Sequence, residues 1–199
     1  MTTCDLSECI AALKHGKIVV YPTDTLYALG ADIYNEASVK RIFMLKHRPF
    51  SQPLPVAVSC IAEVKKLAYT TMVSKRLAQR FLPGALTLVL KKKASGLDVV
   101  SGGKDTIAIR IPSNTIALEL LSKVGPLTVT SANRHGDTPI PEIALIRTQF
   151  QPDDITVYLD CGCLEGKPST IVDCTTKKPR ILREGVITKE EIEDAIVDG

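Results

Sequence analysis

Apolar residues recur along this chain at two spacings, one typical of amphipathic helices and the other of short buried strands. Helical spacing covers residues 5–15, 36–46, 61–68, 73–81, 114–123, 141–150 and 188–197. Short apolar runs bounded by glycine, proline or polar residues predict strands at 18–21, 54–58, 85–90, 106–111, 127–131, 155–159, 169–173 and 180–182. Antiparallel pairs are expected within 86–111 and 170–182. The pattern predicts an α/β fold: one domain over residues 1–199, with helices flanking a twisted, open, mixed parallel and antiparallel sheet.

Polar residues mark where several of these helices begin. Asn35 can cap the second helix, and Ser113 or Asn114 can cap the fifth. Thr188 and Glu191 have the spacing of a capping box at the last helix. These signals fix the helix starts more firmly than the apolar spacing alone does.

Two further segments are expected to be irregular. Pro49 disfavours a helical conformation at Arg48, so the helix 36–46 should end there, with Lys46 and Arg48 at the boundary between helix and loop. Residues 94–104, which contain Gly96, Gly102 and Gly103, predict a flexible loop.

The stretch 17–32 combines a strand with an unusual polar turn. The strand 18–21 runs into Pro22, which cannot donate to a strand ladder. The triplet 23–25, Thr-Asp-Thr, follows directly, and Gly30 lies a few residues on. Ligands of open α/β sheets bind outside the carboxyl ends of strands. A binding site and a simple polar turn are both compatible with this stretch alone.

Composition narrows the class of protein. The formal net charge is +3, from 25 Lys and Arg against 22 Asp and Glu. This mild excess permits an anionic ligand and is far below that of a dedicated nucleic-acid binder. No apolar run reaches the roughly 18 residues of a membrane span, and the first nine residues do not resemble a secretory signal. We therefore expect a soluble, cytoplasmic protein without membrane contact.

The cysteines do not have the spacing of a metal site. None of the six forms a Cys-x-x-Cys pair, and only three histidines are present. Both observations argue against zinc. We expect free thiols, several of them buried, and we expect Cys60 in the core.

Charged and polar groups gather at the ends of the predicted elements. The basic ones are Lys46, Arg48, Arg110 and Arg183. The neutral ones are Thr23, Ser131, Asn133 and Ser169. Guanidinium groups bind oxyanions through two contacts, and lysine acts as a point charge, so the set is typical of a phosphate or carboxylate site. Each residue singly could instead partner a helix dipole, form a turn or lie on the surface.

Two common phosphate-binding motifs are absent from the sequence. Neither Gly-x-x-x-x-Gly-Lys-[Ser/Thr] nor Gly-x-Gly-x-x-Gly after a strand occurs. The P-loop and the dinucleotide-binding fingerprint are therefore excluded.

The polar element ends fall within a series of short motifs. They are PTDTLYALG at 22–30, KHRPFSQPL at 46–54, PGALT at 83–87, RIP at 110–112, TSAN at 130–133, PSTIVD at 168–173 and LREG at 182–185. Each motif alone is weak, but the ordered set covers nearly the whole chain. In this set the chain resembles the YrdC family of threonylcarbamoyl-AMP synthases.

The chain departs from the family pattern at a few positions. Ala28 replaces the usual glycine and Ala85 the usual proline, while Ala57 stands where many members have histidine. Arg134 and His135 replace a small residue and a serine after TSAN. No charged binding group is lost. Longer members carry a second, C-terminal domain, and we expect this chain to comprise the catalytic domain alone.

The resemblance implies a nucleotidyltransferase that uses L-threonine, bicarbonate and ATP. The products would be threonylcarbamoyl-AMP and pyrophosphate, and the adenylate would serve the threonylcarbamoyl-adenosine modification of tRNA through a separate transferase. The threonine amine would form a carbamate with bicarbonate, and a carbamate oxygen would attack the α-phosphorus. Positioning and charge neutralisation would carry the catalysis, without a protein nucleophile.

The resemblance also implies roles for individual residues. Lys46 and Arg48 would be catalytic, binding the phosphates and the carbamate, and Arg110 would pair with the threonine carboxylate. The implied substrate contacts are Thr23, Arg110, Val129, Ser131 and Asn133. The implied nucleotide contacts are Lys46, Phe50, Ser131, Ser169 and Arg183. Asp24 and Thr25 would shape the turn or hydrate a metal, and Tyr27 would line the wall.

Other readings and partners remain open from the sequence. Mg²⁺ would arrive with ATP, held mainly through phosphates. Double-stranded RNA or tRNA could contact the protein, and the main alternative function is an RNA-binding module without catalysis. A carbamoyl-transfer domain of the hydrogenase-maturation type is a further alternative.

Overall fold

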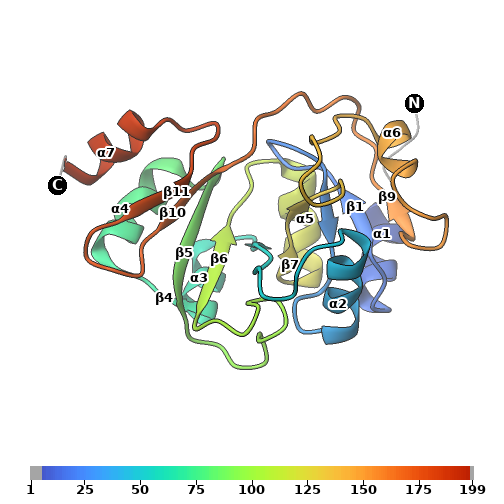
Figure 1. The fold of residues 1–199 in the computed structure, drawn as a ribbon, viewed down its shortest axis with the longest axis horizontal. Helices are drawn as coiled ribbons and strands as arrows, with labels where there is room; N and C mark the ends of the chain where they lie inside the picture. The colour runs from blue at the N-terminus through green and yellow to red at the C-terminus, as the bar shows by residue number, and fades with distance from the viewer. Residues whose placement is uncertain (1–5, 198–199) are drawn as a thin grey trace.

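The computed structural model describes residues 6–197 and places them in two groups of helices and strands joined near the middle of the molecule (Figure 1). The helices are α1 (Leu6–Lys14), α2 (Glu36–Leu45), α3 (Ile61–Leu67), α4 (Met72–Phe81), α5 (Thr115–Val124), α6 (Ile143–Arg147) and α7 (Lys189–Val197). The strands are β1 (Val19–Tyr21), β2 (Ala28–Gly30), β3 (Val56–Ala57), β4 (Ala68–Tyr69), β5 (Leu86–Lys92), β6 (Thr106–Arg110), β7 (Leu127–Thr128), β8 (Thr130–Ser131), β9 (Val157–Tyr158), β10 (Thr170–Asp173) and β11 (Arg180–Arg183).

The strands form two sheets rather than the single sheet predicted. One is four-stranded, in the order β8-β2-β1-β9, and the other is seven-stranded, in the order β11-β10-β5-β6-β3-β7 with β4 beside β5. Parallel and antiparallel pairs occur in both sheets, and the expected antiparallel pairs β5–β6 and β10–β11 are present. The α/β class and the mixed pairing are thus confirmed.

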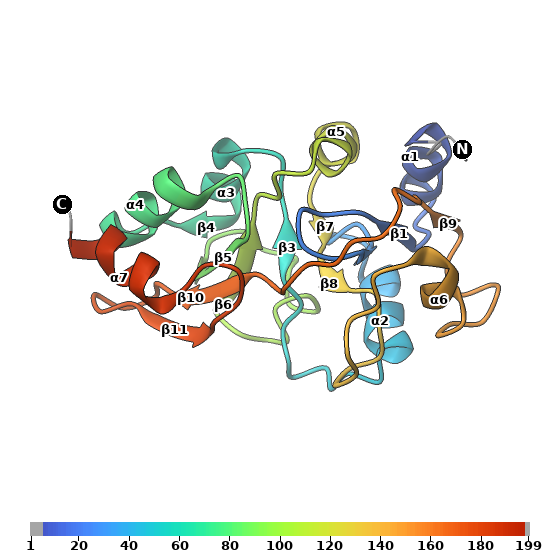
Figure 2. The same cartoon turned by 90° about the horizontal axis from the view of Figure 1, so that it is seen from above.

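A single extended segment joins the two sheets. The predicted strand 127–131 divides at Val129: β7 pairs with β3 of the large sheet, and β8 pairs with β2 of the small one. The Val129 N–H donates to Pro55 O at 2.9 Å, which holds the dividing point against the large sheet. The two sheets therefore meet along this segment, and in Figure 2 β7 and β8 lie between β3 and β1.

The large sheet shows why its two faces differ. Leu88 and Leu90 on β5 and Ile109 on β6 are buried in the hydrophobic core, which also includes residues of α3 and α4. The residues between them, among them Val89 and Ala108, face the space between the sheets. Successive side chains of a strand point to opposite faces. One face of the sheet therefore builds the core, while the other is free to line a site.

The helix caps confirm the sequence signals. The Asn35 side chain accepts a hydrogen bond from Ser38 N at 3.1 Å, and that of Asn114 accepts from Ala117 N at 3.0 Å. Thr188 and Glu191 form the reciprocal capping box at α7. These local devices explain why the helix starts were the most predictable boundaries.

Several predicted elements differ from those observed. The stretch after Tyr21 was expected to be a turn alone, but the chain returns as β2 and pairs with β1. The helix expected at 61–68 ends one residue early, because Ala68 begins β4. The helix expected from Pro141 is the short α6, capped at Glu142. The start of the first predicted helix, at residue 5, lies outside the described residues.

The segment 94–104 is more tightly packed than a flexible loop. Leu97 and Val100 are buried, and Val100 O accepts from Leu54 N at 2.9 Å. Gly102 has φ +60, and a Cβ there would lie 2.9 Å from Phe50 O. The segment is a loop, as predicted, and two buried apolar side chains anchor it to the core.

Cysteines and candidate membrane spans complete the description of the fold. Cys9 and Cys174 are buried, which confirms the prediction that several cysteines are buried. Cys60 is exposed at the start of α3, so its expected place in the core was wrong. Across residues 6–197, no helix has both the length and the apolar character that crossing a membrane requires.

Candidate active site

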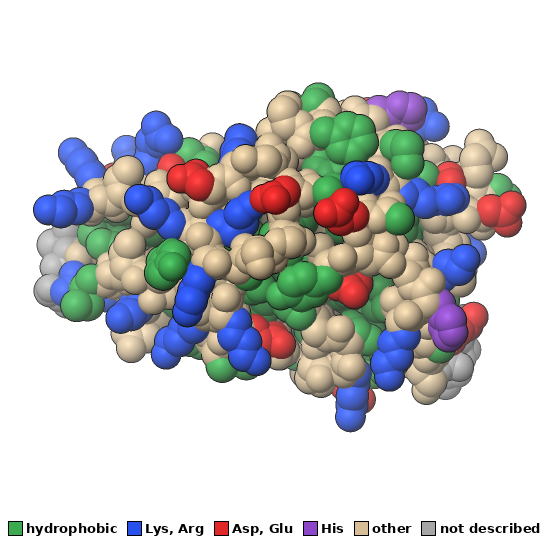
Figure 3. Space-filling model, turned by 90° about the horizontal axis from the view of Figure 1, so that it is seen from below, with side chains coloured by type: hydrophobic (Ala, Val, Ile, Leu, Met, Phe, Trp, Pro, Cys, Tyr) green, Lys and Arg blue, Asp and Glu red, His purple; other side chains and the backbone are tan. Residues whose placement is uncertain are grey.

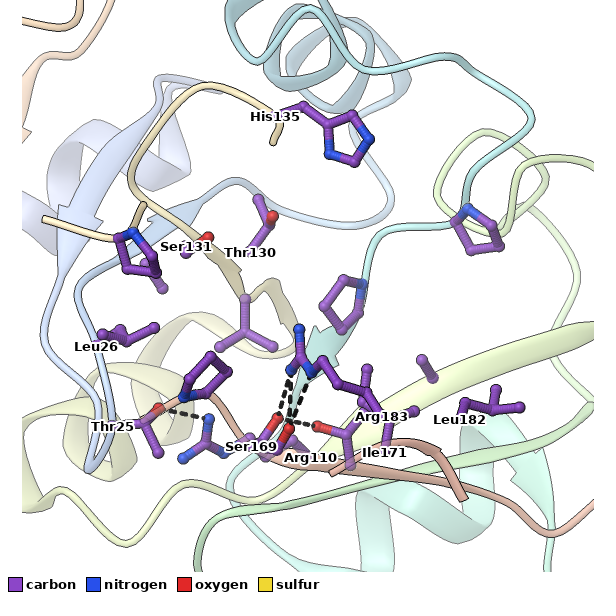
Figure 4. A pocket seen from close by; sticks show the side chains of 18 of the residues that line it. Thr25, Leu26, Arg110, Thr130, Ser131, His135, Ser169, Ile171, Leu182 and Arg183 are labelled. Atoms are coloured by element: carbon purple, nitrogen blue, oxygen red, sulfur yellow. Dashed lines mark hydrogen bonds between the residues drawn. The ribbon is translucent and has the colours of Figure 1, made fainter. Parts of the chain in front are cut away.

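A cavity of about 600 Å³ occupies the space between the two sheets. Its walls come from the β1–β2 turn, the end of α2, the inner face of β5 and β6, the segment from Val129 to Pro139, and the β10–β11 pair. Figure 4 shows side chains from these separate segments converging on one space. The convergence that the sequence could not establish is therefore a property of the fold.

The cavity is strongly basic for a protein of mild overall charge. Its lining contains seven Lys and Arg residues against two Asp, Asp137 and Asp173. The basic ones are Lys46, Arg48, Lys104, Arg110, Arg134, Arg180 and Arg183. An excess of one charge in a recessed site focuses the field and attracts ligands of the opposite charge, in this case anions.

Thr23 holds the β1–β2 turn in shape. Its hydroxyl donates to Leu26 O at 2.7 Å and accepts from the N–H groups of Thr25 and Leu26 at 3.2 and 3.1 Å. The residue is buried and also lines the cavity. Thr23 therefore builds the wall at which it was predicted to meet substrate.

Arg110, on β6, is fixed on several sides. Its Nε donates to Gly84 O at 3.1 Å and its Nη1 to Thr25 Oγ1 at 2.8 Å. Its Nη2 lies 2.8 Å from Asp24 Oδ1 in an ion pair. That approach is too poorly aligned to be a hydrogen bond, so the buried Nη2 has no hydrogen-bond partner. The ion pair balances the charge of Arg110, and the hydrogen bond that Nη2 does not make is one that a ligand can supply.

The end of α2 places two cations in the cavity. His47 adopts φ 50, in the left-handed region, and Arg48 N donates to Phe43 O at 2.9 Å. This is the Schellman arrangement, which turns the chain sharply after the last helical residue. The turn explains how Lys46 and Arg48, two residues apart, both reach the same site.

Lys46 is buried and bound to the backbone of β8 and the residues after it. Its Nζ donates to Ser131 O at 2.6 Å and to Asn133 O at 2.5 Å. Burial, together with the charge of Arg48, lowers the pKa of Lys46 to about 7, and Asp137 opposes this shift. The Lys46 side chain therefore gains or loses its proton near neutral pH.

Arg48 is held by three groups. Its guanidinium donates to Gln52 O at 3.1 Å and to Pro53 O at 2.9 Å, and its Nη1 lies 3.3 Å from His135 Nδ1. Burial and the charge of Arg183 lower the pKa of Arg48. The mutual repulsion of these two arginines indicates a site that an anion would stabilise.

Arg183 and Ser169 close the opposite wall. Arg183 donates from Nε and Nη2 to Ser169 O, at 3.2 and 2.8 Å, as drawn in Figure 4. Ser169 Oγ pairs with Thr87 Oγ1 at 2.8 Å. The backbones before β10 and after β11 lie so close together here that a Cβ at Gly185 would overlap the Pro168 carbonyl.

Asn133 offers an unused acceptor. Its Nδ2 donates to Arg134 O at 3.0 Å and to Asp137 O at 2.7 Å, which fixes the amide. Its Oδ1 is buried and has no hydrogen-bond partner. Buried polar atoms are rarely left unpaired, so this atom marks a place for a ligand donor.

The predicted site residues fall almost entirely in one cavity. Thr23, Lys46, Arg48, Arg110, Val129, Ser131, Asn133, Ser169 and Arg183 all line it. Phe50 does not: its side chain is 53% exposed, and its ring packs on Phe43 with centroids 5.0 Å apart. Its position directly after Pro49 suggested a contact that the path of the chain does not provide in this structure.

Comparison with known proteins decides the family. A family model described as "Telomere recombination", which covers Sua5, YciO and YrdC proteins, matches residues 11–185. The chain belongs to the Sua5/YciO/YrdC family.

Relatives and solved structures agree with this assignment. A putative threonylcarbamoyl-AMP synthase of Methanocaldococcus jannaschii is 39% identical over 182 residues, which cover 90% of this chain and 85% of the relative. The structure of Pyrococcus abyssi Sua5 complexed with L-threonine matches with a TM-score of 0.91 and 36% identity, over 96% of this chain and 57% of that one. Escherichia coli YciO matches with a TM-score of 0.82 and 28% identity, over 91% and 89% of the two chains.

The departures from the Sua5/YciO/YrdC pattern fall in different surroundings. Ala28 lines the cavity, whereas Ala57 is buried in a hydrophobic cluster and does not line it. Ala85 precedes β5 and accepts a backbone hydrogen bond from Thr170. Arg134 and His135 both line the cavity and add a charge and an imidazole to its rim.

Some lining residues of this Sua5/YciO/YrdC chain were not predicted as site residues. Thr87 contacts Ser169 directly, but its hydroxyl carried no signal beyond strand propensity. Lys104 and Arg180 come from a loop and a strand end that the sequence gave no reason to combine. Asp24 and Thr25 shape the turn, as one of the two predicted options stated, through their contacts with Arg110.

Proposed function

We propose that this chain is a threonylcarbamoyl-AMP synthase, which joins L-threonine, bicarbonate and ATP and releases pyrophosphate. One observation carries the proposal: the cavity has two ends of different chemistry. We name each end by its cations. One is Arg110, whose buried Nη2 faces Asp24 without forming a hydrogen bond. The other is the set Lys46, Arg48 and Arg183, for which the described residues supply no carboxylate at ion-pair distance. An amino acid and a polyphosphate require ends of these two kinds.

L-Threonine is assigned to the end formed by Arg110 and the β1–β2 turn. The Nη2 of Arg110, which makes no hydrogen bond to Asp24, can donate to the carboxylate, since guanidinium forks suit planar oxyanions. Thr23 and Thr25 also line the cavity; Thr25 Oγ1 accepts from Arg110 and orients it, while the Thr23 hydroxyl is bonded within the turn. The solved Pyrococcus abyssi relative was crystallised as a complex with L-threonine, which supports an amino acid as the ligand.

ATP is assigned to the other end. Lys46 and Arg48 would bind its phosphates, and Arg183 and Ser169 would lie beside the nucleotide. The inner face of the large sheet adds Val89, a partly exposed apolar side chain, to this wall. Ser131 lies between the two ends and can reach either ligand.

The reaction needs positioning and charge neutralisation rather than a protein nucleophile. The threonine amine adds to the carbon of bicarbonate, water is lost, and a carbamate results. A carbamate oxygen attacks the α-phosphorus, the bond to the bridging oxygen breaks, and pyrophosphate leaves. Lys46 and Arg48 would offset the charge that gathers on the leaving group, and Asn133 Oδ1 could accept from the substrate nitrogen.

Magnesium is proposed to arrive bound to ATP. Among the described residues, no group of three or more His, Cys, Asp or Glu side chains could hold a metal ion. The donor set therefore fits a metal held through phosphate oxygens, with Asp137 and Asp173 as the nearby carboxylates of the lining. Bound there, Mg²⁺ would shield the phosphate charge.

The place of the protein in the cell follows from its product. Threonylcarbamoyl-AMP is a reactive mixed anhydride, so we propose that a separate transferase passes its acyl group to tRNA in the cytoplasm.

A direct contact with double-stranded RNA or tRNA stays a proposal. On the face shown in Figure 3, Lys and Arg side chains lie among carboxylates and apolar groups rather than in one basic track. The described residues on that face therefore give no support to the RNA-binding module.

Release of pyrophosphate from ATP tests the proposal. The assay is run complete, then without threonine, and then without bicarbonate. We expect both omissions to abolish release, and activity indifferent to either would contradict the proposed reaction. Carbamoyl phosphate that replaced threonine and bicarbonate would support the hydrogenase-maturation type instead. Salt-sensitive RNA binding without turnover would support the RNA-binding module.

A further inference from the structure

The two ends of the cavity balance their positive charge differently. Arg110 forms an ion pair with Asp24 at 2.8 Å, and the two side chains are only 5% and 16% exposed. Across residues 6–197, no carboxylate lies within the 4.0 Å of an ion pair from Lys46, Arg48 or Arg183. The Arg110 end is therefore close to neutral, whereas the opposite end carries excess positive charge.

Asp24 is linked to the cavity through its ion pair with Arg110. It is not one of the residues that line the cavity. Its Oδ1 accepts from Ser113 N at 3.0 Å, and the same atom faces Arg110 Nη2. Burial lowers the pKa of Arg110, and the charge of Asp24 opposes that shift. The carboxylate thus compensates the guanidinium without offering a contact to a ligand.

Charge balance matters because the two proposed ligands differ in charge. An amino acid brings a single carboxylate, while ATP and pyrophosphate bring several negative charges. Electrostatic interactions in a recessed, partly desolvated site are much stronger than in water. A guanidinium without compensation at the threonine end would therefore attract phosphate groups away from the end where Lys46 and Arg48 lie.

We propose that Asp24 is a specificity-determining residue, which neutralises Arg110 so that this end of the cavity accepts an amino-acid carboxylate and rejects polyphosphate. Asp24 positions and balances Arg110 and does not contact the reacting atoms. The inference rests on the proposed function, because it assumes that threonine binds beside Arg110.

The substitution Asp24→Asn separates charge from geometry. An asparagine Oδ1 can accept from Ser113 N and face Arg110 as the aspartate does, so the change removes the charge and keeps the shape. Asp154→Asn is a matched control outside the cavity. Asp154 likewise pairs with an arginine, Arg41 at 3.1 Å, and accepts from a backbone N–H, that of Gln151 at 2.9 Å.

The experiment is calorimetric titration of L-threonine into each protein, with and without saturating inorganic pyrophosphate. In the wild type and in Asp154→Asn, we expect pyrophosphate to change the threonine Kd by less than about twofold. In Asp24→Asn, we expect pyrophosphate to weaken threonine binding about tenfold, because it now occupies both ends. Asp24→Ser, which also removes the charge, repeats the test if the asparagine variant does not fold.

Two results would overturn the inference. One is a threonine Kd in Asp24→Asn that is as insensitive to pyrophosphate as that of the wild type. The other is a folded Asp24→Asn that no longer binds threonine even without pyrophosphate, since Asp24 would then serve threonine itself. Failure of the proposed function is distinct: no protein, including the wild type, would bind threonine. Pyrophosphate titrated alone would still test the charge argument, with about tenfold tighter binding expected in Asp24→Asn and unchanged binding contradicting it.

Discussion

The end of the cavity assigned to threonine and the end assigned to the phosphates hold their cations in different ways. At the threonine end, Arg110 is locked by Asp24, Thr25 and Gly84 and keeps one nitrogen without a hydrogen bond. At the phosphate end, Lys46 and Arg48 are bound mainly to backbone carbonyls. Carbonyl oxygens orient a cation without neutralising it.

This difference shows how one small cavity can separate two anionic ligands. Hydrogen bonds orient the cations at both ends. Among the described residues, a carboxylate forms an ion pair with the cation at only one end, where Asp24 meets Arg110.

Burial is the main cause of the lowered pKa values of Arg48 and His135. The charge of Arg183 lowers the pKa of Arg48 further. The charges of Arg48 and Lys46 lower the pKa of His135 further. The pKa of Arg183 is lowered by burial and by the charge of Arg110. The phosphate end therefore binds more favourably when several negative charges arrive together.

The largest expected effect follows removal of the threonine anchor. Arg110→Ala should lower threonine-dependent pyrophosphate release by about a hundredfold to a thousandfold, because it removes a buried, hydrogen-bonded charge. Activity as a function of threonine concentration measures this loss. A thermal melt is the control, since Asp24 is left without its partner. Wild-type release from a folded variant would show that Arg110 does not bind threonine.

A smaller and selective effect is expected at the opposite wall. Arg183→Ala should raise the Kd for ATP by roughly tenfold, the value of one charge-assisted contact, and leave the Kd for threonine unchanged. Calorimetry with each ligand separately measures both. Equal losses for ATP and threonine would remove the distinction between the two ends.

The change in ATP affinity with pH is expected to be the next largest effect. The pKa of Lys46 is about 7, so its ammonium form is present below that pH and is lost above it. An anion prefers the ammonium form, and ATP affinity should therefore fall by roughly fivefold to tenfold as the pH rises from about 6 to about 8.5.

Lys46→Met controls for the ionisation of ATP itself. The variant should bind ATP more weakly, and its affinity should vary with pH much less than that of the wild type. Identical pH profiles for the two proteins would show that Lys46 does not titrate in this range or does not contact the phosphates.

The smallest effect is expected at Phe50. The half-exposed ring packs on Phe43 outside the cavity, so Phe50→Ala should change the Kd for ATP by less than about threefold. A tenfold loss would instead support the contact with the nucleotide that the sequence suggested, and would require the 49–53 segment to move on binding.

Much of the fold could be predicted because local physics determines it. The capped helices α2, α5 and α7 carry polar residues with one evident partner each. By contrast, β2 escaped prediction because it is three residues long and follows a turn rich in threonine. The division of the segment 127–131 between two sheets depends on partners far apart in the sequence, so no local pattern indicates it.

The site was predictable in its residues but not in its contacts. Arg110 and Arg183 were selected as cations at strand ends, and both line the cavity. That Asp24 compensates only one of them depends on how the β1–β2 turn lies against β6, which is a tertiary property. Phe50 shows the converse, because closeness in sequence to Arg48 did not place it at the site.

Isotopic labelling of the product tests the central claim most directly. The protein is incubated with ATP, L-threonine and bicarbonate that carries a heavy carbon isotope, and the nucleotide product is analysed by mass spectrometry. We predict an adenylate that contains both threonine and the heavy carbon. An adenylate of threonine without that carbon, or no threonine-containing adenylate at all, would contradict the account.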